Sequence, residues 1–304
     1  MIDIHIATRD RPTELFGLLE SIREQSSAEK FNIVILDDGG GTPIANYYFL
    51  QYMFNRLKCE GHNVVIIRNE IASGVSKARQ TLVDWSLKNS KSKLFARIDD
   101  DSILECDYIF KLLKVIDNGY DVASGIVPHF GSPETIRDIK FVEPVIGYCE
   151  LNDKGELIAN YDDCSTHFTE EKILPSPHFR SCALFKREIF ENGIDYNSRL
   201  SKNGFREEQI LSFKIISKGY KIGIHTGAIA WHLATPSGGE RDTMNLGAFN
   251  QQIFDETTKR IFEEKGDFIK SYYNNLGVIP IKKTNGELLK SINLVNKKED
   301  IKLL

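Results

Sequence analysis

Residues 2–36, IDIHIATRDRPTELFGLLESIREQSSAEKFNIVIL, contain the pattern that decides the fold of this chain. Residues 2–7 alternate isoleucine with aspartate and histidine, which is the period of a β-strand. Apolar residues then recur at the spacing of a helix, at Leu15, Leu18, Leu19 and Ile22. The β-branched run at 32–36 predicts a second strand. The stretch therefore predicts one strand–helix–strand unit.

The same alternation continues toward the middle of the chain. Residues 43–60 favour a helix, 63–67 (NVVII) a strand, 76–85 a helix and 94–98 (LFARI) a fourth strand. Strands that alternate with helices of this length predict a parallel sheet covered on both faces. We expect an α/β fold with a mainly parallel sheet flanked by helices.

The second half is less regular, and residues 128–178 are rich in loops and proline. The segments expected to be ordered are a strand at 121–127, a hairpin of 145–151 with 156–161, the strand-like 181–185, a helix at 207–218 ended by Gly219, strands at 221–225 and 228–232, and an amphipathic helix after about 245. We divide the chain into a domain of residues 1–244, with halves 1–127 and 128–244, and a C-terminal extension and tail, 245–304.

Composition restricts the class of protein. Of 304 residues, 41% are hydrophobic and 27% are charged, which is typical of an ordinary globular protein. The formal net charge of −4 gives no basic field that would recruit nucleic acid, so a nucleic-acid partner is not expected. The cysteines are scattered and odd in number, which favours reduced thiols. No signal peptide or membrane-spanning run is apparent, so we expect a cytoplasmic protein.

Three polar clusters follow predicted strands, at residues 8–11, 37–38 and 99–101. The carboxyl ends of parallel strands meet at one edge of a sheet, and ligands bind there. We therefore expect these clusters to form one site.

Asp99, Asp100 and Asp101 concentrate negative charge, and neighbouring carboxylates repel each other unless a cation is present. Carboxylate oxygens suit Mg²⁺ or Mn²⁺. Alternate residues of an extended segment point the same way, so Asp99 and Asp101 are expected to face one site. The alternative is that the aspartates only cap a helix that begins near Cys106.

Seven segments, in this order, resemble the family-2 glycosyltransferases with the GT-A fold. They are 2–25, NIVILDDGG (32–40), GVSKARQTLVDW (74–85), FARIDDDS (95–102), FRSCALFKREIF (179–190), GFREEQILSFKIISKGYKI (204–222) and AIAWHL (228–233). The resemblance covers about residues 1–235 and implies a mixed, mainly parallel sheet flanked by helices, followed by a C-terminal helical extension. It implies an inverting transferase that moves a sugar from a nucleotide-sugar donor to an acceptor hydroxyl with the help of Mn²⁺ or Mg²⁺.

The resemblance also implies roles for single residues. The expected donor-binding residues are Thr8, Arg9, Asp37, Asp38, Arg79, Asp99, Asp100 and Arg241, with Asp38 beside the base and Asp99 near the ribose. The composition of TPSGGERD (235–242), which contains Arg241, suits a lid that closes over the diphosphate and equally an ordinary linker. Asp101 and His232 would hold the metal. Asp37 and Asp38 could instead only shape a turn, and Arg79 could be a solvated helix residue.

Glu207 and Glu208 match the acidic pair of the family, which more often reads Glu-Asp. The resemblance assigns the general base to Glu208, in the Asp position, although its side chain is one methylene longer. A surface glutamate pair that favours the helix dipole is the alternative. Residues 193–204 and Trp231 would border the acceptor.

Other functions stay open at this level. A nucleotidyltransferase shares a similar nucleotide-binding half but usually needs a glycine-rich phosphate loop, and TRDRP (8–12) lacks glycine. A binding module without catalysis is the third alternative. The donor is expected to be a UDP-sugar, with thymidine or guanosine carriers open. The acceptor could be a glycan, a lipid-linked sugar, a protein or another molecule with a hydroxyl group. The lysines between 282 and 302 could contact an anionic membrane or a partner, and a solvated tail is the alternative.

Overall fold

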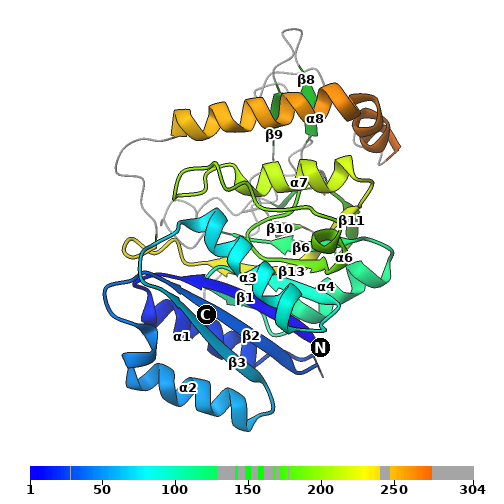
Figure 1. Cartoon of the computed structure of the whole chain (residues 1–304). Coiled ribbons are helices and arrows are strands. Elements are labelled where there is room, and N and C mark those ends of the chain that lie inside the picture. Colours follow the sequence, from blue (N-terminus) through cyan, green and yellow to red (C-terminus); the bar gives the residue numbers. More distant parts are fainter. Residues whose placement is uncertain are drawn as a thin grey trace.

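In the computed structural model, a sheet with the strand order β11-β13-β6-β12-β4-β1-β2-β3 forms the centre of the molecule (Figure 1). The structure describes residues 1–27, 29–128, 171–176, 178–239 and 247–275, and four short strands between 141 and 168. The sheet strands are β1 (Ile2–Thr8), β2 (Phe31–Asp38), β3 (Asn63–Asn69), β4 (Leu94–Arg97), β6 (Val122–Ile126), β11 (Ile173–Pro175), β12 (Ala183–Lys186) and β13 (Ile222–His232). The short β5 (Ser102–Leu104) pairs with β13.

The N-terminal half forms the parallel block that the sequence predicts. β1 pairs in parallel with both β2 and β4, and β2 pairs in parallel with β3. Strands β6 and β13 have the same direction, whereas β12 is antiparallel to β4 and β6, and β11 is antiparallel to β13. The expected mixed, mainly parallel sheet is confirmed.

Helices cover one face of this sheet because alternate strand residues are apolar. Ile2, Ile4 and Ile6 are buried in one cluster with apolar residues of three helices. These helices are α1 (Pro12–Arg23), α2 (Tyr48–Cys59) and α4 (Tyr108–Asp117). His5 points to the opposite face, where its imidazole lies 2.7 Å from the Ser86 hydroxyl.

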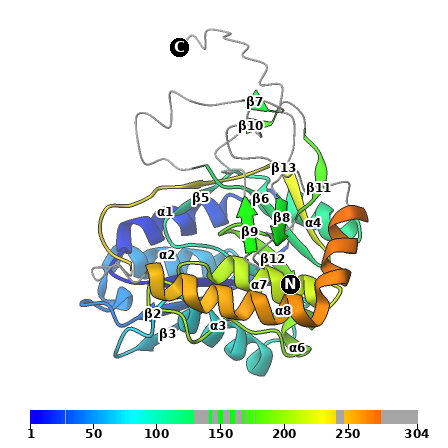
Figure 2. The ribbon, with the colours of Figure 1, turned by 90° about the horizontal axis from the view of Figure 1, so that it is seen from above.

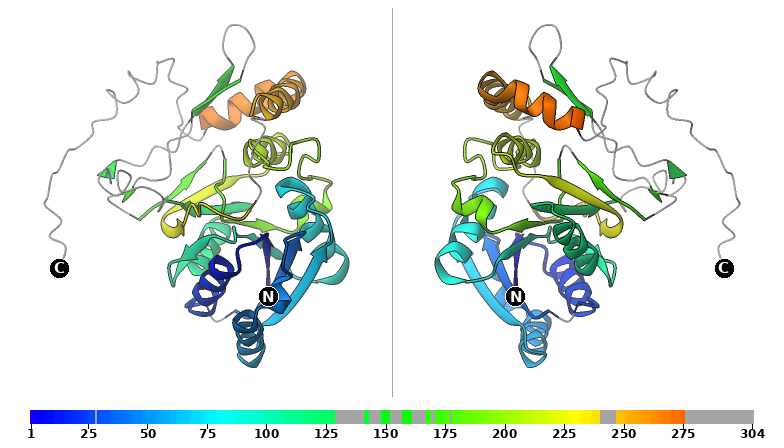
Figure 3. Two further views of the ribbon diagram at one scale, coloured as in Figure 1. Left: turned by 90° about the vertical axis from the view of Figure 1, so that its left-hand side faces the viewer. Right: turned by 90° about the vertical axis from the view of Figure 1, so that its right-hand side faces the viewer.

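The opposite face is covered by α3 (Val75–Asn89), α6 (Glu188–Glu191) and α7 (Glu207–Ser217), and α8 (Gly247–Asn275) adds a further layer over α7 (Figure 3). Helices α7 and α8 lie alongside each other when seen from above (Figure 2). The Phe213 ring of α7 contacts the rings of Phe254 and Phe262 of α8, at 6.2 and 5.8 Å between centroids. The described part of the predicted C-terminal extension is therefore packed on the second hydrophobic core.

One expected break in a strand is absent. The sequence predicts two strands at 221–225 and 228–232, and the structure has one strand, β13, with a register shift between Ile224 and Ile229. The bulge is held by the Gly227 amide, which donates to His225 Nδ1 at 3.1 Å. Lys111 Nζ donates to the Gly227 carbonyl at 2.8 Å. These contacts replace ladder bonds, so the chain stays extended and reaches β5.

The predicted hairpin of the loop-rich region is present as β8 (Tyr148–Leu151) paired antiparallel with β9 (Leu157–Asn160). The division of residues 1–244 into two halves stays a prediction. Among the described residues, no helix combines the length and the apolar character needed to cross a membrane.

Candidate active site

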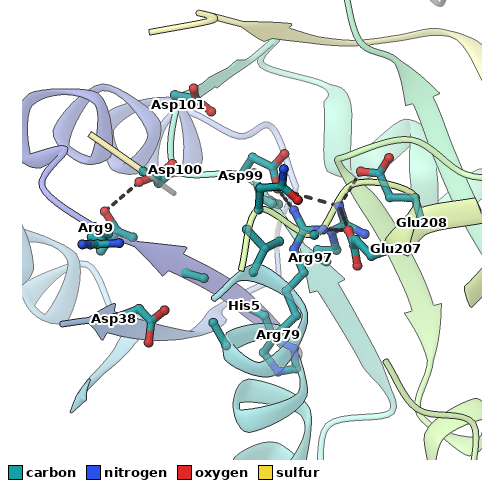
Figure 4. A pocket seen from close by; sticks show the side chains of 18 of the residues that line it. His5, Arg9, Asp38, Arg79, Arg97, Asp99, Asp100, Asp101, Glu207 and Glu208 are labelled. Atoms are coloured by element: carbon teal, nitrogen blue, oxygen red, sulfur yellow. Dashed lines mark hydrogen bonds and ion pairs between the residues drawn. The ribbon is translucent and has the colours of Figure 1, made fainter. Parts of the chain in front are cut away.

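A pocket of about 510 Å³ opens at the carboxyl ends of β1 and β4, which is the edge where the sequence predicts the site. Its walls come from the loops after these strands, from α3, from the start of α7 and from residues 232–239. Of the predicted site residues, it is lined by Thr8, Arg9, Asp38, Arg79, Asp99, Asp100, Asp101, Glu207, Glu208 and His232. Figure 4 shows most of these side chains around one cavity.

The three aspartates divide between two groups of partners. Asp100 accepts hydrogen bonds from Thr8 Oγ1 at 2.8 Å and from Arg11 Nη1 at 2.8 Å. The same Arg11 nitrogen lies 3.0 Å from Asp101 Oδ2. Asp99 accepts instead from Arg79 Nη2 at 2.7 Å. The acidic cluster therefore has one pair, Asp100–Asp101, and one separate carboxylate.

Asp99 and Asp101 both line the pocket, but they bind different partners and do not share the extended backbone from which their common site was predicted. That expectation needs extended backbone, but β4 ends at Arg97 and the chain turns, with the Ser102 amide donating to the Asp99 carbonyl at 3.2 Å. The turn sends Asp99 toward Arg79 and Arg97, as Figure 4 shows. The aspartates also do not cap the next helix, since α4 begins at Tyr108.

Burial and ion pairs shift the acidic groups in opposite directions. Burial raises the pKa of Asp99, but the positive charges of Arg79 and Arg97 outweigh it, so its pKa lies below the ordinary value. Burial raises the pKa of Asp100 to about 6, in spite of Arg11, and the neighbouring charge of Asp101 adds to the rise. Asp99 is thus held ionised, and Asp100 gains a proton more readily.

The two glutamates at the start of α7 occupy different environments. Glu207 is 4% exposed and forms ion pairs with Arg79 and with Arg97, whose Nη2 lies 2.9 Å from Glu207 Oε1. The Glu208 side chain is 30% exposed and accepts from Arg97 Nη2 at 2.5 Å. Glu208 is therefore the glutamate that a bound molecule can reach.

Asp38 lies on the pocket wall but has several partners of its own. Its carboxylate accepts from Asn69 Nδ2 at 2.7 Å, from the Ser73 amide and hydroxyl, and from the Gly74 amide at 3.0 Å. In this structure it fixes the loop before α3. Asp37 does not line the pocket, and its carboxylate accepts from Arg68 Nη1 at 2.6 Å.

The sequence interpretation gives no role to Arg97 and no individual role to Arg11 or Tyr196, which enter it only as members of the cluster 8–11 and of the expected acceptor region 193–204. Arg97 is 3% exposed, and its guanidinium lies between the glutamates and the Phe179 ring, 5.6 Å from the ring centroid. Tyr196 is 3% exposed beside the same arginine. A charged residue inside the apolar strand FARI was the available signal for Arg97, because an arginine is buried only when it is paired.

The backbone around the pocket is strained. Asp10, Arg206 and Ala234 have φ of 54°, 74° and 49° and are the non-glycine residues with positive φ in the described part of the chain. Arg206 and Ala234 line the pocket, and Asp10 lies between Arg9 and Arg11, which line it too. Such strain collects where the surrounding structure fixes a functional geometry.

Some predicted residues are not brought to the pocket. Trp231 does not line it, and its indole Nε1 donates to Glu105 Oε1 at 2.7 Å. Of the expected acceptor region, Tyr196, Asn203 and Gly204 line the pocket. Arg241 and part of the predicted lid lie outside the described residues, as do the lysines between 282 and 302.

The donor set around Asp101 suits a hard cation. His232 Nε2 lies 3.3 Å from Asp101 Oδ1, and the Asp100 and Asp101 carboxylates converge on the single point that Arg11 Nη1 occupies. Oxygen ligands with one imidazole fit Mn²⁺, and oxygen ligands fit Mg²⁺. Within the described residues, however, no group of three or more His, Cys, Asp or Glu side chains is placed so that it could hold a metal ion, so the cation belongs to the proposal below.

Solved structures show which known fold this chain shares. The structure of GalNAc-T7 with UDP, GalNAc and Mn²⁺ is similar with a TM-score of 0.63 at 16% identity, over 95% of this chain and 54% of that chain. The structure of S. aureus TarS is similar with a TM-score of 0.52 at 16% identity, over 77% of this chain and 37% of that one. The structure of S. aureus TarS 1–349 in complex with UDP is similar with a TM-score of 0.52 at 14% identity, over 77% of this chain and 61% of that one.

The chain thus has the fold of the GT-A glycosyltransferases, and it spans about half the length of GalNAc-T7. The sequence profile described as "Glycosyl transferase family 2" matches residues 3–193, more than half of the chain. The chain belongs to glycosyl transferase family 2. No curated protein matches it in sequence. The family match ends before Glu207 and His232.

Proposed function

We propose that this protein is a glycosyltransferase that moves a sugar from a UDP-sugar to an acceptor hydroxyl with inversion at the anomeric carbon, and that Glu208 is the general base. The observation that supports the proposal is that possible cation ligands and an exposed carboxylate line the same pocket. The Asp100–Asp101 pair with His232 lies on one side, and the exposed carboxylate of Glu208 lies at the start of α7.

The donor side of the pocket is suited to a nucleoside diphosphate. Asp101 and His232, with Asp100, would hold Mn²⁺ or Mg²⁺, which would neutralise the departing diphosphate as a Lewis acid. Arg9 lines the same wall and can contact an anionic group. The described pocket volume, about 510 Å³, lies in the range of small-ligand sites.

On the acceptor side of the pocket, the two glutamates at the start of α7 have different roles in this proposal. Glu208 accepts the proton of the acceptor hydroxyl, whose oxygen forms a bond to the anomeric carbon while the bond from that carbon to the diphosphate oxygen breaks. Arg97 Nη2, 2.5 Å from Glu208 Oε1, fixes the orientation of this carboxylate. Glu207 holds Arg79 and Arg97 in place through buried ion pairs. A single displacement needs no enzyme nucleophile.

The acceptor is proposed to be a glycan, a lipid-linked sugar or another molecule with a free hydroxyl. GalNAc-T7 was solved with UDP, GalNAc and Mn²⁺, and a TarS fragment was solved with UDP, which supports a UDP-sugar donor here.

The test combines binding and turnover. Isothermal titration should show UDP binding that is at least about tenfold tighter with Mn²⁺ than with EDTA, because an ion held by Asp100, Asp101 and His232 would compensate the charge of the diphosphate. GDP and dTDP titrations report the preference for the base, and a panel of nucleotide sugars tested for donor hydrolysis reports the sugar. UDP binding without metal dependence would contradict the metal part, and absence of both binding and hydrolysis for every nucleotide sugar would contradict the transferase.

A further inference from the structure

Arg11 lies at the point where a cation is expected. Its Nη1 is 2.8 Å from Asp100 Oδ1 and 3.0 Å from Asp101 Oδ2, and its side chain is 12% exposed. The two carboxylates are themselves almost completely buried, with side-chain exposures of 7% and 3%. One guanidinium nitrogen therefore bridges both acids in the interior of the pocket.

A second segment holds the same arginine from the other side. We call residues 233–239 the cover segment. Arg11 Nε donates to the Ser237 carbonyl at 3.2 Å, and the Gly239 amide donates to the Arg9 carbonyl at 2.8 Å. The contact is close: a Cβ on Gly239 would lie 2.8 Å from Arg11 Nη2, and a Cβ on Gly238 would lie 2.5 Å from Arg11 Cγ.

A positive charge is needed where the Asp100 and Asp101 carboxylates lie side by side. Two ionised carboxylates side by side in a buried site need a positive charge nearby, because otherwise one of them takes up a proton. Arg11 supplies that charge in the structure described here, since the His232 imidazole near Asp101 is charged only when protonated. A divalent cation on the same oxygens would lie within contact distance of the guanidinium and would repel it.

We propose that Arg11 is a built-in counter-cation that occupies the cation site of the metal-free protein and leaves the two carboxylates when the divalent cation binds. This inference rests on the cation of the proposed function. Because the same guanidinium holds Ser237, departure of Arg11 also releases one attachment of the cover segment. Cation binding and the anchoring of the cover segment are thereby coupled.

The test measures affinity for Mn²⁺ alone, by electron paramagnetic resonance of the free aqueous ion during titration. Arg11→Gln removes the competing charge, so its affinity for Mn²⁺ should be at least about tenfold higher than that of the wild type. Arg11→Lys keeps the charge and should stay within about threefold of the wild type. Arg56→Gln is the control, because it removes an equal charge from an exposed pair with Glu60.

Gain of affinity separates this role from a merely structural one, since damage to the site would weaken Mn²⁺ binding. Unchanged or weaker binding by a folded Arg11→Gln variant would overturn the inference, while UDP binding that still depends on Mn²⁺ would leave the proposed function standing. Equal gains in Arg56→Gln and Arg11→Gln would also overturn it. If no variant bound Mn²⁺ with or without UDP, the cation and this inference would both fail.

A second measurement uses the wild-type protein and so does not depend on the folding of a variant. Hydrogen exchange followed by mass spectrometry should show faster amide exchange in residues 235–239 when Mn²⁺ is added without nucleotide. The amides of β2 serve as the internal reference and should not change. Slower or unchanged exchange in the cover segment, under conditions where Mn²⁺ is bound, would show that Mn²⁺ binding does not release the contact between Arg11 and this segment.

Discussion

Glu207 and Glu208 are neighbours in the chain, yet their environments assign them different tasks. Glu207 is buried between Arg79 and Arg97, whereas Glu208 keeps 30% of its side chain exposed in the pocket. A helix that begins at Glu207 turns the two side chains in different directions. At the residue scale, the two glutamates are of the same type, and their different exposure decides that Glu208 can act on a molecule in the pocket.

Replacing Glu208 with glutamine should remove the base and keep the shape. We expect the transfer rate to fall about 10²–10⁴-fold, the usual contribution of a general base. The Kd for UDP should stay within about twofold, because the donor side is unchanged. Initial rates of transfer, or of donor hydrolysis, and UDP titration measure the two quantities.

Glu207→Gln is the matched comparison. It leaves two buried arginines with less compensating charge, so we expect a loss of about 3 kcal/mol in the free energy of unfolding. Urea denaturation of both variants measures it. If Glu207→Gln lost turnover at full stability while Glu208→Gln kept near-normal turnover, the assignment of the base to Glu208 would be wrong.

His5 gives the structure a dependence on pH. Burial lowers the pKa of His5 from 6.5 to about 4, and the nearby Asp3 only partly opposes the shift. In the unfolded chain, His5 therefore binds a proton as the pH falls below 6.5. In the folded chain, it does so only near pH 4. The stabilisation is complete above pH 6.5 and is lost progressively as the pH falls through that window.

The wild type should consequently lose about 2 kcal/mol more than His5→Gln between pH 7 and pH 5. The difference between the two proteins isolates His5 from the carboxylates that titrate over the same range. Denaturant unfolding at both pH values measures it. Parallel pH curves for the two proteins would contradict the shift.

At the scale of elements, α8 braces the loop that precedes α7. The buried Asn250 side chain accepts from the Ser201 amide at 2.8 Å and donates to Asn203 Oδ1 at 2.7 Å. Asn203 lines the pocket. The helix that follows the pocket-forming chain thus fixes one wall of the pocket.

Asn250→Ala should leave the polar groups of this loop without partners. We expect a loss of about 1–3 kcal/mol in stability and a rise in the KM for the acceptor, with UDP binding unchanged. Gln252→Ala, on the exposed side of α8, should stay within about 0.5 kcal/mol of the wild type. Equal effects of both substitutions would show that α8 does not position the loop.

At the scale of the whole molecule, α8 and the sheet share one hydrophobic core. Phe254 is 1% exposed in a cluster that includes Phe185 of β12 and Phe213 of α7. Removal of α8 would uncover this apolar layer. The domain and the described part of the extension should therefore unfold together.

Phe254→Ala tests whether α8 and the rest of the domain unfold together. We expect a loss of about 3–5 kcal/mol with a single cooperative transition, because a buried phenylalanine leaves a cavity. Phe249→Ala, on the same helix but 45% exposed, should have little effect. Circular dichroism and intrinsic fluorescence during denaturation should report the same midpoint; two separate transitions would indicate that α8 folds as an independent unit.

The sequence determined the order of strands and helices through β4, the parallel pairing of these strands, and the edge at which Thr8, Asp38 and Asp101 meet. These features follow from local periodicity and from the rule that parallel strands end at one edge. The bulge that keeps β13 continuous and the turn that separates Asp99 from Asp101 were not predicted, because each depends on contacts that the local period does not contain.

Only the tertiary structure decided which charges meet. Arg97 pairs with Glu208 across 111 positions, and Arg11 pairs with Asp100 across 89. The packing of α7 over the sheet sets the first pair, and the approach of the β4 turn to the loop after β1 sets the second. An arginine in the sequence carries its charge but not its partner, since burial and distance are properties of the folded chain.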